Sequence, residues 1–527
     1  MAFGELALKL GMLLVFFAIM IYVGFYCRKH STDVNGFVLG GRNVGPWLTA
    51  FAYGTSYFSA VVFVGYAGQF GWKFGIAATW VGIGNAIIGS LLAWVILGRR
   101  TRIMTQRLSS ATMPDFFGKR FSMNSLKIGA SIVIFIFMIP YTASLYNGLS
   151  RLFGMAFNID YAVCVIVMAV LTAIYVIVGG YMATAINDFI QGLIMLVGIV
   201  AVIFAVLSQH GGLIGSLNAL AAVKDPTITN GDVPGIFNSF LGPDPLSLLG
   251  VVLLTSLGTW GLPQMIGKFY AIRNEGAIHK GTVISTFFAI VIAGGCYFLG
   301  GFGRIFFENN VGNPQGGFDN VIPTMLSNLS PFLLAVVIVL VLSASMSTLS
   351  SLVLTSSSTV TLDLLKGRVI KEMDEKKQLL VMRVLIVVFI VISAALAIFQ
   401  ANSSVAFIAQ AMGISWGAMA GAFLAPFLYG LYWKRTTGRA CWASMIFSSV
   451  FMTLDMLANL GVISLNLGIL QSPINAGAFC MIAGLVLVPL VSLITRAPDR
   501  KKVDDVFAGY DRMVTVRAKD SIETEEN

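Results

Sequence analysis

The stretch "PFLLAVVIVLVLSASMSTLSS" (331–351) joins an apolar run to a run rich in hydroxyl groups. Its first part, 331–342, contains no hydroxyl, whereas six of the nine residues in "SASMSTLSS" (343–351) are serine or threonine. About 20 mostly apolar residues are enough for a helix to cross a bilayer. Hydroxyl groups at that depth need hydrogen-bond partners. The stretch therefore predicts a membrane-spanning helix whose second half contacts polar atoms of another segment.

The composition of the whole chain also indicates a membrane protein. Of its 527 residues, 57% are hydrophobic and 11% are charged, which is about half the charged share of an average soluble protein. Five cysteines fall in apolar segments without a CxxC pair, a pattern typical of small buried side chains. Three histidines fall in loops, and we find no nucleophile–base pair or phosphate-binding loop, so we do not expect an enzyme.

The apolar runs predict an all-α polytopic membrane protein. We expect one transmembrane domain at residues 1–495 and a charged cytoplasmic tail at 496–527. Thirteen spans are predicted near 5–27, 46–71, 74–98, 127–150, 159–180, 184–208, 246–270, 280–302, 330–360, 379–400, 404–433, 440–465 and 474–495.

Basic residues divide unevenly between the two sides of these spans. Every second loop, together with the tail, holds 29 of the 34 lysines and arginines when residues near a span's end are assigned to the adjoining loop. Because cytoplasmic loops collect basic residues, we expect a multi-pass protein of the cell membrane with its amino terminus outside and its carboxyl terminus in the cytoplasm. This bias explains the net charge of +10, so we expect no nucleic-acid partner. The five basic residues on the opposite side are Lys9, Lys73, Arg151, Lys224 and Arg304.

Two spans carry residues that weaken helices at mid-depth. Span 46–71 has small and polar residues in its middle, and span 246–270 contains Gly258, Gly261 and Pro263. Both are predicted to be discontinuous, although glycine and proline are also common in unbroken membrane helices. The two spans lie five apart and cross in opposite directions, as inverted repeats require. Such paired breaks point to a transport site.

Four stretches of the chain resemble the sodium/solute symporter family, which includes proline, pantothenate, sugar and sialic acid carriers. The resemblance extends over about residues 5–495. It implies a LeuT-type core of two inverted five-span repeats, here near 46–208 and 246–433, and sodium-driven symport by alternating access. The stretches are "FVLGGRNVGPWLTAFAYGTSYFSA" (37–60), "ATMPDFFGKRF" (111–121), "GGYMATAINDFIQ" (179–191) and "SASMSTLSS" (343–351).

In the 343–351 run, residues three and four apart lie one above the other, so one helix face is shared by Ala344, Ser347, Thr348 and Ser351, with Ser350 at its border. Such a face can serve close helix packing, or its hydroxyls can bond back to their own helix. It can also bind a hard cation, which prefers oxygen ligands such as the carbonyls that a broken helix frees. The resemblance implies Na⁺ as the coupling ion, in a site that we call sodium site one. Its ligands would be backbone oxygens of Thr55, Phe58 and Ala344 and the hydroxyls of Ser347 and Thr348.

Asp188 and Asp455 are the two acids predicted to lie deep in the membrane. A carboxylate there is a functional candidate because burying it is unfavourable. The resemblance implies a second sodium site, which some family members have, and with it the transport of two sodium ions per solute. Its residues, which we call the Asp188 set, would be Asp188, Ser347, Ser350 and Ser351. Alternatively, Asp188 is a helix-start acid favoured by the helix dipole. For Asp455 we favour a structural hydrogen bond.

A solute pocket is predicted between the two broken spans, where aromatic rings and a few polar groups suit a small organic molecule. The aromatic residues could equally serve packing. Proline carriers have an aspartate at the place of Tyr57 and aromatics at the places of Thr255 and Thr259, so we favour another amino acid or a monocarboxylate. A sugar, polyol or sialic-acid-like solute is the alternative. The predicted lining is Tyr57, Ser59, Tyr141, Ser144, Thr255, Thr259, Trp260 and Gln264.

Two other classes of membrane protein compete with a transporter. A channel would favour a repeated pore motif or rings of charge, and we see neither. A sensor would need a signalling partner, because the tail of about 30 residues is too short for a kinase. We expect the partners to be sodium, a small organic solute and the lipid bilayer, and the working unit to be a monomer.

Single-cysteine labelling tests this topology. A cysteine at Asn466, between the last two spans, should react with an impermeant maleimide added to intact cells. One at Lys501 should react only after permeabilisation. Labelling of both positions from the same side would exclude the predicted orientation.

Overall fold

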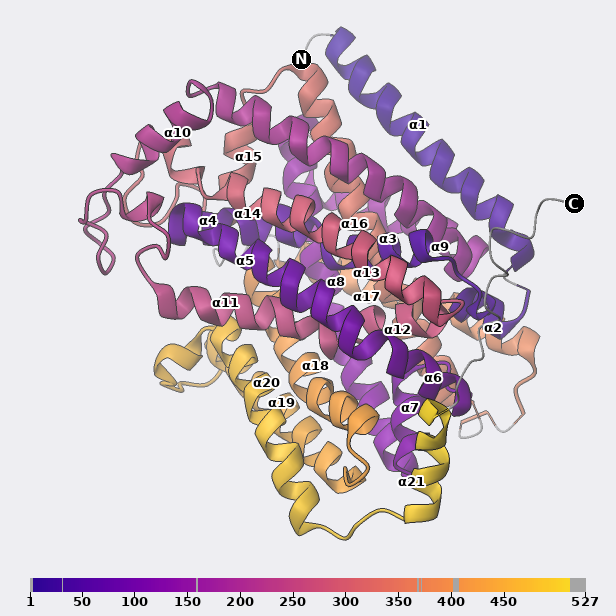
Figure 1. Cartoon of the computed structure of the whole chain (residues 1–527). Helices are drawn as coiled ribbons and strands as arrows, with labels where there is room; N and C mark the ends of the chain where they lie inside the picture. Colours follow the sequence, from indigo (N-terminus) through magenta and orange to yellow (C-terminus); the bar gives the residue numbers. More distant parts are fainter. Residues whose placement is uncertain are drawn as a thin grey trace, which may run out of the picture.

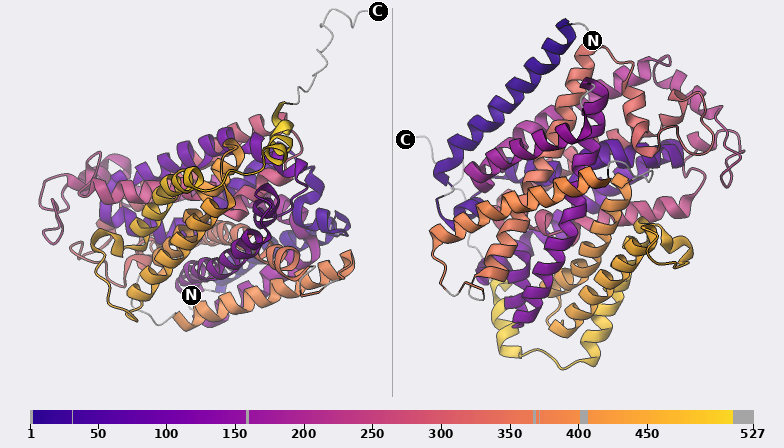
Figure 2. Two further views of the ribbon diagram at one scale, coloured as in Figure 1. Left: turned by 90° about the horizontal axis from the view of Figure 1, so that it is seen from below. Right: turned by 180° about the vertical axis from the view of Figure 1, so that it is seen from behind.

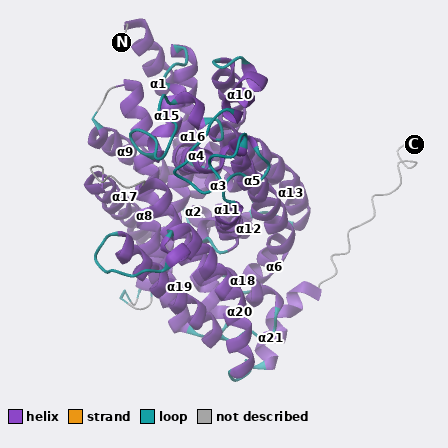
Figure 3. Cartoon of the chain, turned by 90° about the vertical axis from the view of Figure 1, so that its left-hand side faces the viewer, coloured by secondary structure: helices purple, strands orange, loops and turns teal. Residues whose placement is uncertain are grey.

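The protein is helical throughout the part of the chain that the structure describes. The computed structural model describes residues 3–30, 32–157, 160–366, 369–370, 372–400 and 407–511. These residues form helices and loops and no β-strand (Figure 3), which confirms the all-α prediction. The predicted span starts at 159 and 404 and the tail residues 512–527 lie outside the described ranges.

The long helices account for most of the predicted spans. They are α1 (Phe3–Cys27), α8 (Asn124–Phe157), α9 (Tyr161–Ser208), α13 (Glu275–Ala289), α16 (Pro331–Thr359), α17 (Glu375–Gln400), α18 (Phe407–Tyr432), α19 (Gly438–Asn459) and α20 (Pro473–Ile494). Shorter helices are α2 (Val34–Leu39), α3 (Pro46–Tyr57), α4 (Ala67–Phe74), α5 (Thr79–Gly84), α6 (Arg99–Arg107), α7 (Met113–Arg120), α10 (Gly212–Ala221), α11 (Pro245–Leu257), α12 (Pro263–Ala271), α14 (Gly295–Gly300), α15 (Val321–Leu326) and α21 (Arg500–Phe507). The π-helical segments η3 (Val61–Tyr66), η5 (Asn85–Leu92), η6 (Trp94–Gly98), η9 (Ile290–Gly294) and η12 (Val360–Leu365) continue several of them.

Two helical runs are too long for a single crossing. By length and composition, the described residues hold ten helices able to cross a membrane, or eleven with one bent pair, but Val61–Arg107 has 47 residues and α9 has 48. At 1.5 Å per residue each would be about 70 Å long, more than twice the hydrocarbon thickness. Each run turns at a glycine, Gly75 (φ 63°, ψ −144°) or Gly180 (φ 57°, ψ −152°). When each run is divided at its glycine, and α3 is taken together with residues 61–74, the described helices account for the thirteen predicted spans.

The core of the bundle forms around α16. This helix packs against α9, α8 and α3, and its 343–351 run is buried throughout. Figures 1 and 2 show α1 along one edge of the molecule and α19 and α20 along another. Large apolar side chains on the outer faces of the helices are exposed, among them Leu14 (71%), Phe204 (74%) and Ile494 (84%). Apolar side chains with this exposure suit contact with lipid.

A buried ion pair ties together the loops at one end of the bundle. Arg304 Nη1 lies 2.9 Å from Asp225 Oδ2, and Arg304 Nε donates to the Trp72 carbonyl at 2.7 Å. The same carboxylate oxygen accepts from the Gly312 N–H at 3.0 Å. Truncating either charged partner would leave the other buried without compensation, which is strongly destabilising.

Because the chain turns at Gly75, we expect one added methyl group there to lower the stability of the protein. In Gly75→Ala the new Cβ would overlap the Phe237 carbonyl oxygen, at a backbone conformation that only glycine adopts readily. We expect about 1–3 kcal/mol of destabilisation from the strained backbone alone, seen as a lower apparent melting temperature in detergent. Gly294→Ala is the matched control, because its added Cβ meets no atom within 4 Å. Equal melting temperatures for the two variants would contradict this account of the turn.

Candidate functional site

The first broken span leaves free carbonyl groups at the centre of the molecule. Helix α3 ends at Tyr57, and Phe58 is extended (φ −103°, ψ 92°), with its N–H bonded to the Gly54 carbonyl at 3.0 Å. The chain turns helical again after Ser59, whose hydroxyl accepts from the Val61 N–H at 3.2 Å. The last four carbonyls of a helix have no partner within that helix. Here those carbonyls belong to residues 55–58.

Two hydroxyls from α16 meet the first of these carbonyls. The hydroxyls of Ser347 and Thr348 each lie 3.1 Å from the Thr55 carbonyl oxygen and 3.2 Å from that of Ala344. All four residues are at most 1% exposed. The structure thus brings together four of the five residues predicted for sodium site one, and the fifth, Phe58, is the residue at the break.

The spacing of these oxygens suits a cation of the size of Na⁺. Ca²⁺, which has nearly the same ionic radius, binds oxygens at 2.3–2.6 Å. Ligands about 90° apart at that distance would be separated by roughly 3.3–3.7 Å. The observed separations of 3.1 and 3.2 Å would have to widen by only a few tenths of an ångström. The oxygens are therefore close to a ligand arrangement.

Other hydroxyls of the 343–351 run bond back to their own helix. Ser345 donates to the Val341 carbonyl at 2.8 Å, and Ser350 donates to the Ser347 carbonyl at 2.9 Å. The packing interpretation of the run therefore describes these two serines, whereas Ser347 and Thr348 reach another span. The spacing of the sequence could not distinguish the two groups.

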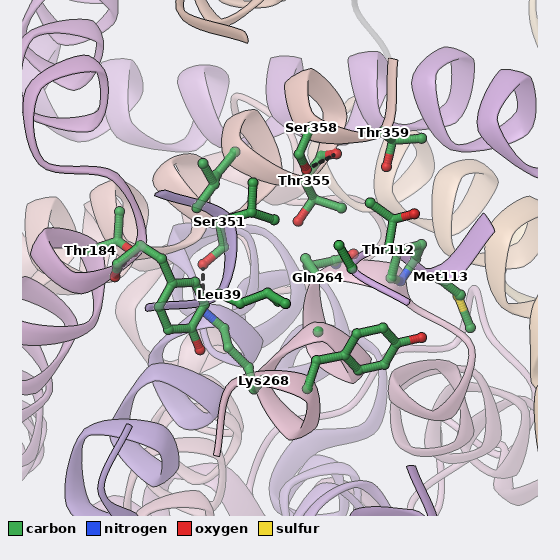
Figure 4. A pocket seen from close by; sticks show the side chains of 17 residues that line it. Leu39, Thr112, Met113, Thr184, Gln264, Lys268, Ser351, Thr355, Ser358 and Thr359 are labelled. Atoms are coloured by element: carbon green, nitrogen blue, oxygen red, sulfur yellow. Dashed lines mark hydrogen bonds between the residues drawn. The ribbon is translucent and has the colours of Figure 1, made fainter. Parts of the chain in front are cut away.

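Two members of the Asp188 set, Asp188 and Ser351, contact Lys268, a lysine near the end of a predicted span that the charge count assigned to the adjoining loop. Lys268, on α12, is 3% exposed, and Asp188, on α9, is fully buried. The Lys268 ammonium lies 3.7 Å from Asp188 Oδ2. It also donates to the Ser351 hydroxyl at 3.0 Å (Figure 4). The Ser351 hydroxyl is also 2.8 Å from that of Ser56, which the sequence analysis missed. Removing Lys268 from the 29 basic residues leaves 28, so the charge bias persists.

The second broken span also has the predicted interruption. Helix α11 and a short 3₁₀ segment, Gly258–Trp260, end before α12, and the two parts are bent by 41°. Pro263 is the first residue of α12, where the missing N–H of proline leaves no hydrogen bond unmade. The Tyr57 hydroxyl donates to the Thr255 carbonyl at 2.6 Å. The two broken spans are thus in direct contact beside their breaks.

Aromatic side chains fill the space between the broken spans. The rings of Tyr57 and Tyr141 each lie 6.0 Å from the ring of Trp416 on α18. Trp416 was not predicted, and one tryptophan among eight offered no signal in the sequence. Trp260 and Thr259 instead contact η5, where they donate to the carbonyls of Ile88 and Gly89 at 3.0 and 3.1 Å.

The remaining predicted pocket residues are divided between two places. Ser144 bonds to the Tyr141 carbonyl at 2.7 Å, close to the aromatic group. Gln264 instead lines a separate cavity with Lys268, Ser351 and Thr355 (Figure 4). Its buried amide has no hydrogen-bond partner among the described residues. Asp455 lies apart from all of these on α19, where the Asn459 amide donates to it at 3.3 Å.

Two discontinuous helices in an all-α membrane fold, with oxygens gathered at the break of one of them, define a secondary active transporter. The profile of the sodium:solute symporter family matches residues 37–447. The chain belongs to this family and therefore carries out sodium-coupled symport of a small organic solute, with Na⁺ as the coupling ion.

Curated relatives match over most of their length. The osmoregulated proline transporter OpuE of Bacillus subtilis is 29% identical over 504 residues, which cover 94% of this chain and 96% of that protein. A sodium/proline symporter of Staphylococcus aureus is 31% identical over 449 residues, covering 82% and 83% of the two chains. Both are transporters, which agrees with the prediction that the protein is not an enzyme.

A solved structure confirms the fold. A Na⁺-coupled sialic acid symporter in a substrate-bound outward-open state superposes with a TM-score of 0.73, at 16% identity, over 94% of this chain and 99% of that one. The protein therefore has the predicted LeuT-type architecture.

Proposed function

We propose that the driving sodium ion binds at sodium site one. The observation that supports this most directly is the convergence of the Ser347 and Thr348 hydroxyls on the Thr55 carbonyl, within 3.1 Å. An ion there would bind three carbonyls and two hydroxyls, a set without full charge that suits a monovalent cation better than a divalent one. The two hydroxyls also bond to the carbonyls of Thr55 and Ala344, so these four ligands are already gathered before an ion binds.

Sodium site one couples two parts of the molecule. Thr55 and Phe58 belong to the broken span, and the other ligands belong to α16, which packs against α9 and α8. A bound ion would hold the broken span against α16, and its release would let them separate. A ligand that binds one arrangement better shifts the population toward it. Sodium binding can therefore favour one of the two conformations of the alternating-access cycle.

The solute that we propose is a small amino acid or a monocarboxylate. The relatives named as proline transporters support an amino acid, and the packed rings of Tyr57, Tyr141 and Trp416 favour a compact molecule with an apolar part. None of the predicted lining residues is charged, so bound sodium and helix ends would balance a carboxylate. A sugar or polyol remains the alternative because the lining also offers hydroxyls.

We further propose a monomer in the cell membrane with the amino terminus outside. The transmembrane domain would end near residue 495, and the described part of the cytoplasmic tail would dock on the bundle. Helix α21 packs against α6, where Arg107 lies 2.6 Å from Asp505. Lys434 lies 2.7 Å from Asp504 on the same helix.

Uptake into proteoliposomes tests the solute class. With an inward sodium gradient, pooled labelled amino acids or monocarboxylates should accumulate above equilibrium, and potassium in place of sodium should abolish this. Accumulation of sugars alone would favour the alternative solute. A voltage-driven ion current with solute uptake that ignores the sodium gradient would favour a channel.

The double variant Ser347→Ala, Thr348→Ala tests sodium site one. It removes two of five ligands at a depth where water cannot replace them, so we expect loss of sodium-driven uptake and of saturable ²²Na⁺ binding with the fold retained. Ser345→Ala is the matched control, because the Ser345 hydroxyl donates to the Val341 carbonyl of its own helix. Unchanged sodium dependence in the double variant would remove this site from the mechanism.

A further inference from the structure

Lys268 places a full positive charge in the buried interior of the helix bundle. It lies on α12, the second half of a broken span, and it is 3% exposed. Its ammonium is 3.7 Å from Asp188 Oδ2 on α9, 3.0 Å from the Ser351 hydroxyl on α16, and 5.4 Å from the centre of the Tyr181 ring. A carboxylate, a hydroxyl oxygen and an aromatic face are the groups that stabilise a monovalent cation.

The Asp188 carboxylate needs such a cation. A carboxylate buried in a membrane protein is paired or performs a function that requires its charge. Among the described residues, Lys268 is the basic side chain within ion-pair distance of Asp188. The ammonium thus supplies the compensating charge from within the chain.

The other two members of the Asp188 set have their hydroxyls engaged elsewhere. Ser347 points its hydroxyl to the Thr55 carbonyl, within sodium site one, and Ser350 bonds back to α16. Only Asp188 and Ser351 remain, and the Lys268 ammonium contacts both; Figure 4 shows its contact with Ser351. The place predicted for a second sodium ion is therefore the place where the structure puts the ammonium.

We propose that the Lys268 ammonium is the permanent cation of the site formed by Asp188 and Ser351, so that sodium binds at sodium site one alone and one sodium ion accompanies each solute. This inference rests on the proposed sodium site one. A tethered cation cannot be released to either side of the membrane, so it draws no energy from the sodium gradient. It instead links α12 to α9 and α16, and through the Ser351–Ser56 contact of 2.8 Å it links them to α3.

Counting bound sodium tests the inference without knowledge of the solute. Purified protein in nanodiscs should bind one ²²Na⁺ at saturation. Lys268→Met keeps the length of the side chain but removes its charge, so the uncompensated carboxylate should recruit sodium and raise the count to two. The control Lys268→Arg keeps the cation and should stay at one. Lys268→Met combined with Asp188→Asn removes both charges and should return the count to one.

Each outcome has a distinct meaning. Two sodium ions bound to the parent protein would overturn the inference. One ion bound to Lys268→Met would also overturn it, because that ion, bound at sodium site one, shows that the variant is folded. If Lys268→Met does not fold, the number of sodium ions bound is compared for the parent protein and for Lys268→Met combined with Asp188→Asn. One ion is expected for each, and two ions bound to the parent would overturn the inference. No saturable binding to the parent would instead contradict the proposed sodium site one. Adding Ser347→Ala and Thr348→Ala to Lys268→Met should lower the count from two to one.

Discussion

The backbone carbonyls at the break in the first core span must find partners inside a membrane protein, and the rest of the site depends on this constraint. A helix that stops at mid-depth leaves carbonyls that neither lipid nor bulk water can satisfy. The Thr55 carbonyl is satisfied by the Ser347 and Thr348 hydroxyls, which lie on a different helix. This requirement explains why a hydroxyl-rich run follows an apolar run on α16. It also explains how a polar, cation-sized arrangement can persist in a buried core.

Much of the fold could be predicted from the sequence because bilayer thickness fixes the length of a span. The breaks at Phe58 and at Gly258–Leu262 fall where small residues, glycine and proline interrupt apolar runs. The helical period correctly placed Ser347 and Thr348 on one face. What hydropathy could not show is that two pairs of spans form helical runs of 47 and 48 residues, turned at Gly75 and Gly180. Glycine is frequent in this chain, with 55 residues, so its special conformation at two positions gave no signal.

Lys268 shows where sequence reasoning fails for a physical reason. A lysine close to the end of an apolar run normally extends to the membrane surface, so assigning it to the loop follows the general rule. Burial of this one depends on its partner Asp188, which is 80 residues away in the sequence on a helix of the other repeat. Trp416 was missed for a related reason, because only its distance to Tyr57 and Tyr141 distinguishes it from a packing residue.

The position of the ammonium determines how much work each transport cycle can perform. Two unit charges about 4 Å apart repel by ~4 kcal/mol at an effective dielectric constant of 20, so Lys268 offsets the attraction that the Asp188 carboxylate would exert on a second sodium ion. With a tenfold sodium gradient and 100 mV across the membrane, one ion supplies about 3.7 kcal/mol. That energy supports accumulation of a neutral solute by roughly 500-fold, whereas two ions would support roughly the square of that ratio. A fixed lysine thus lowers the maximum ratio of inside to outside solute concentration, and each solute costs the cell one sodium ion instead of two. This arrangement suits a carrier whose solute is present outside at more than trace concentration.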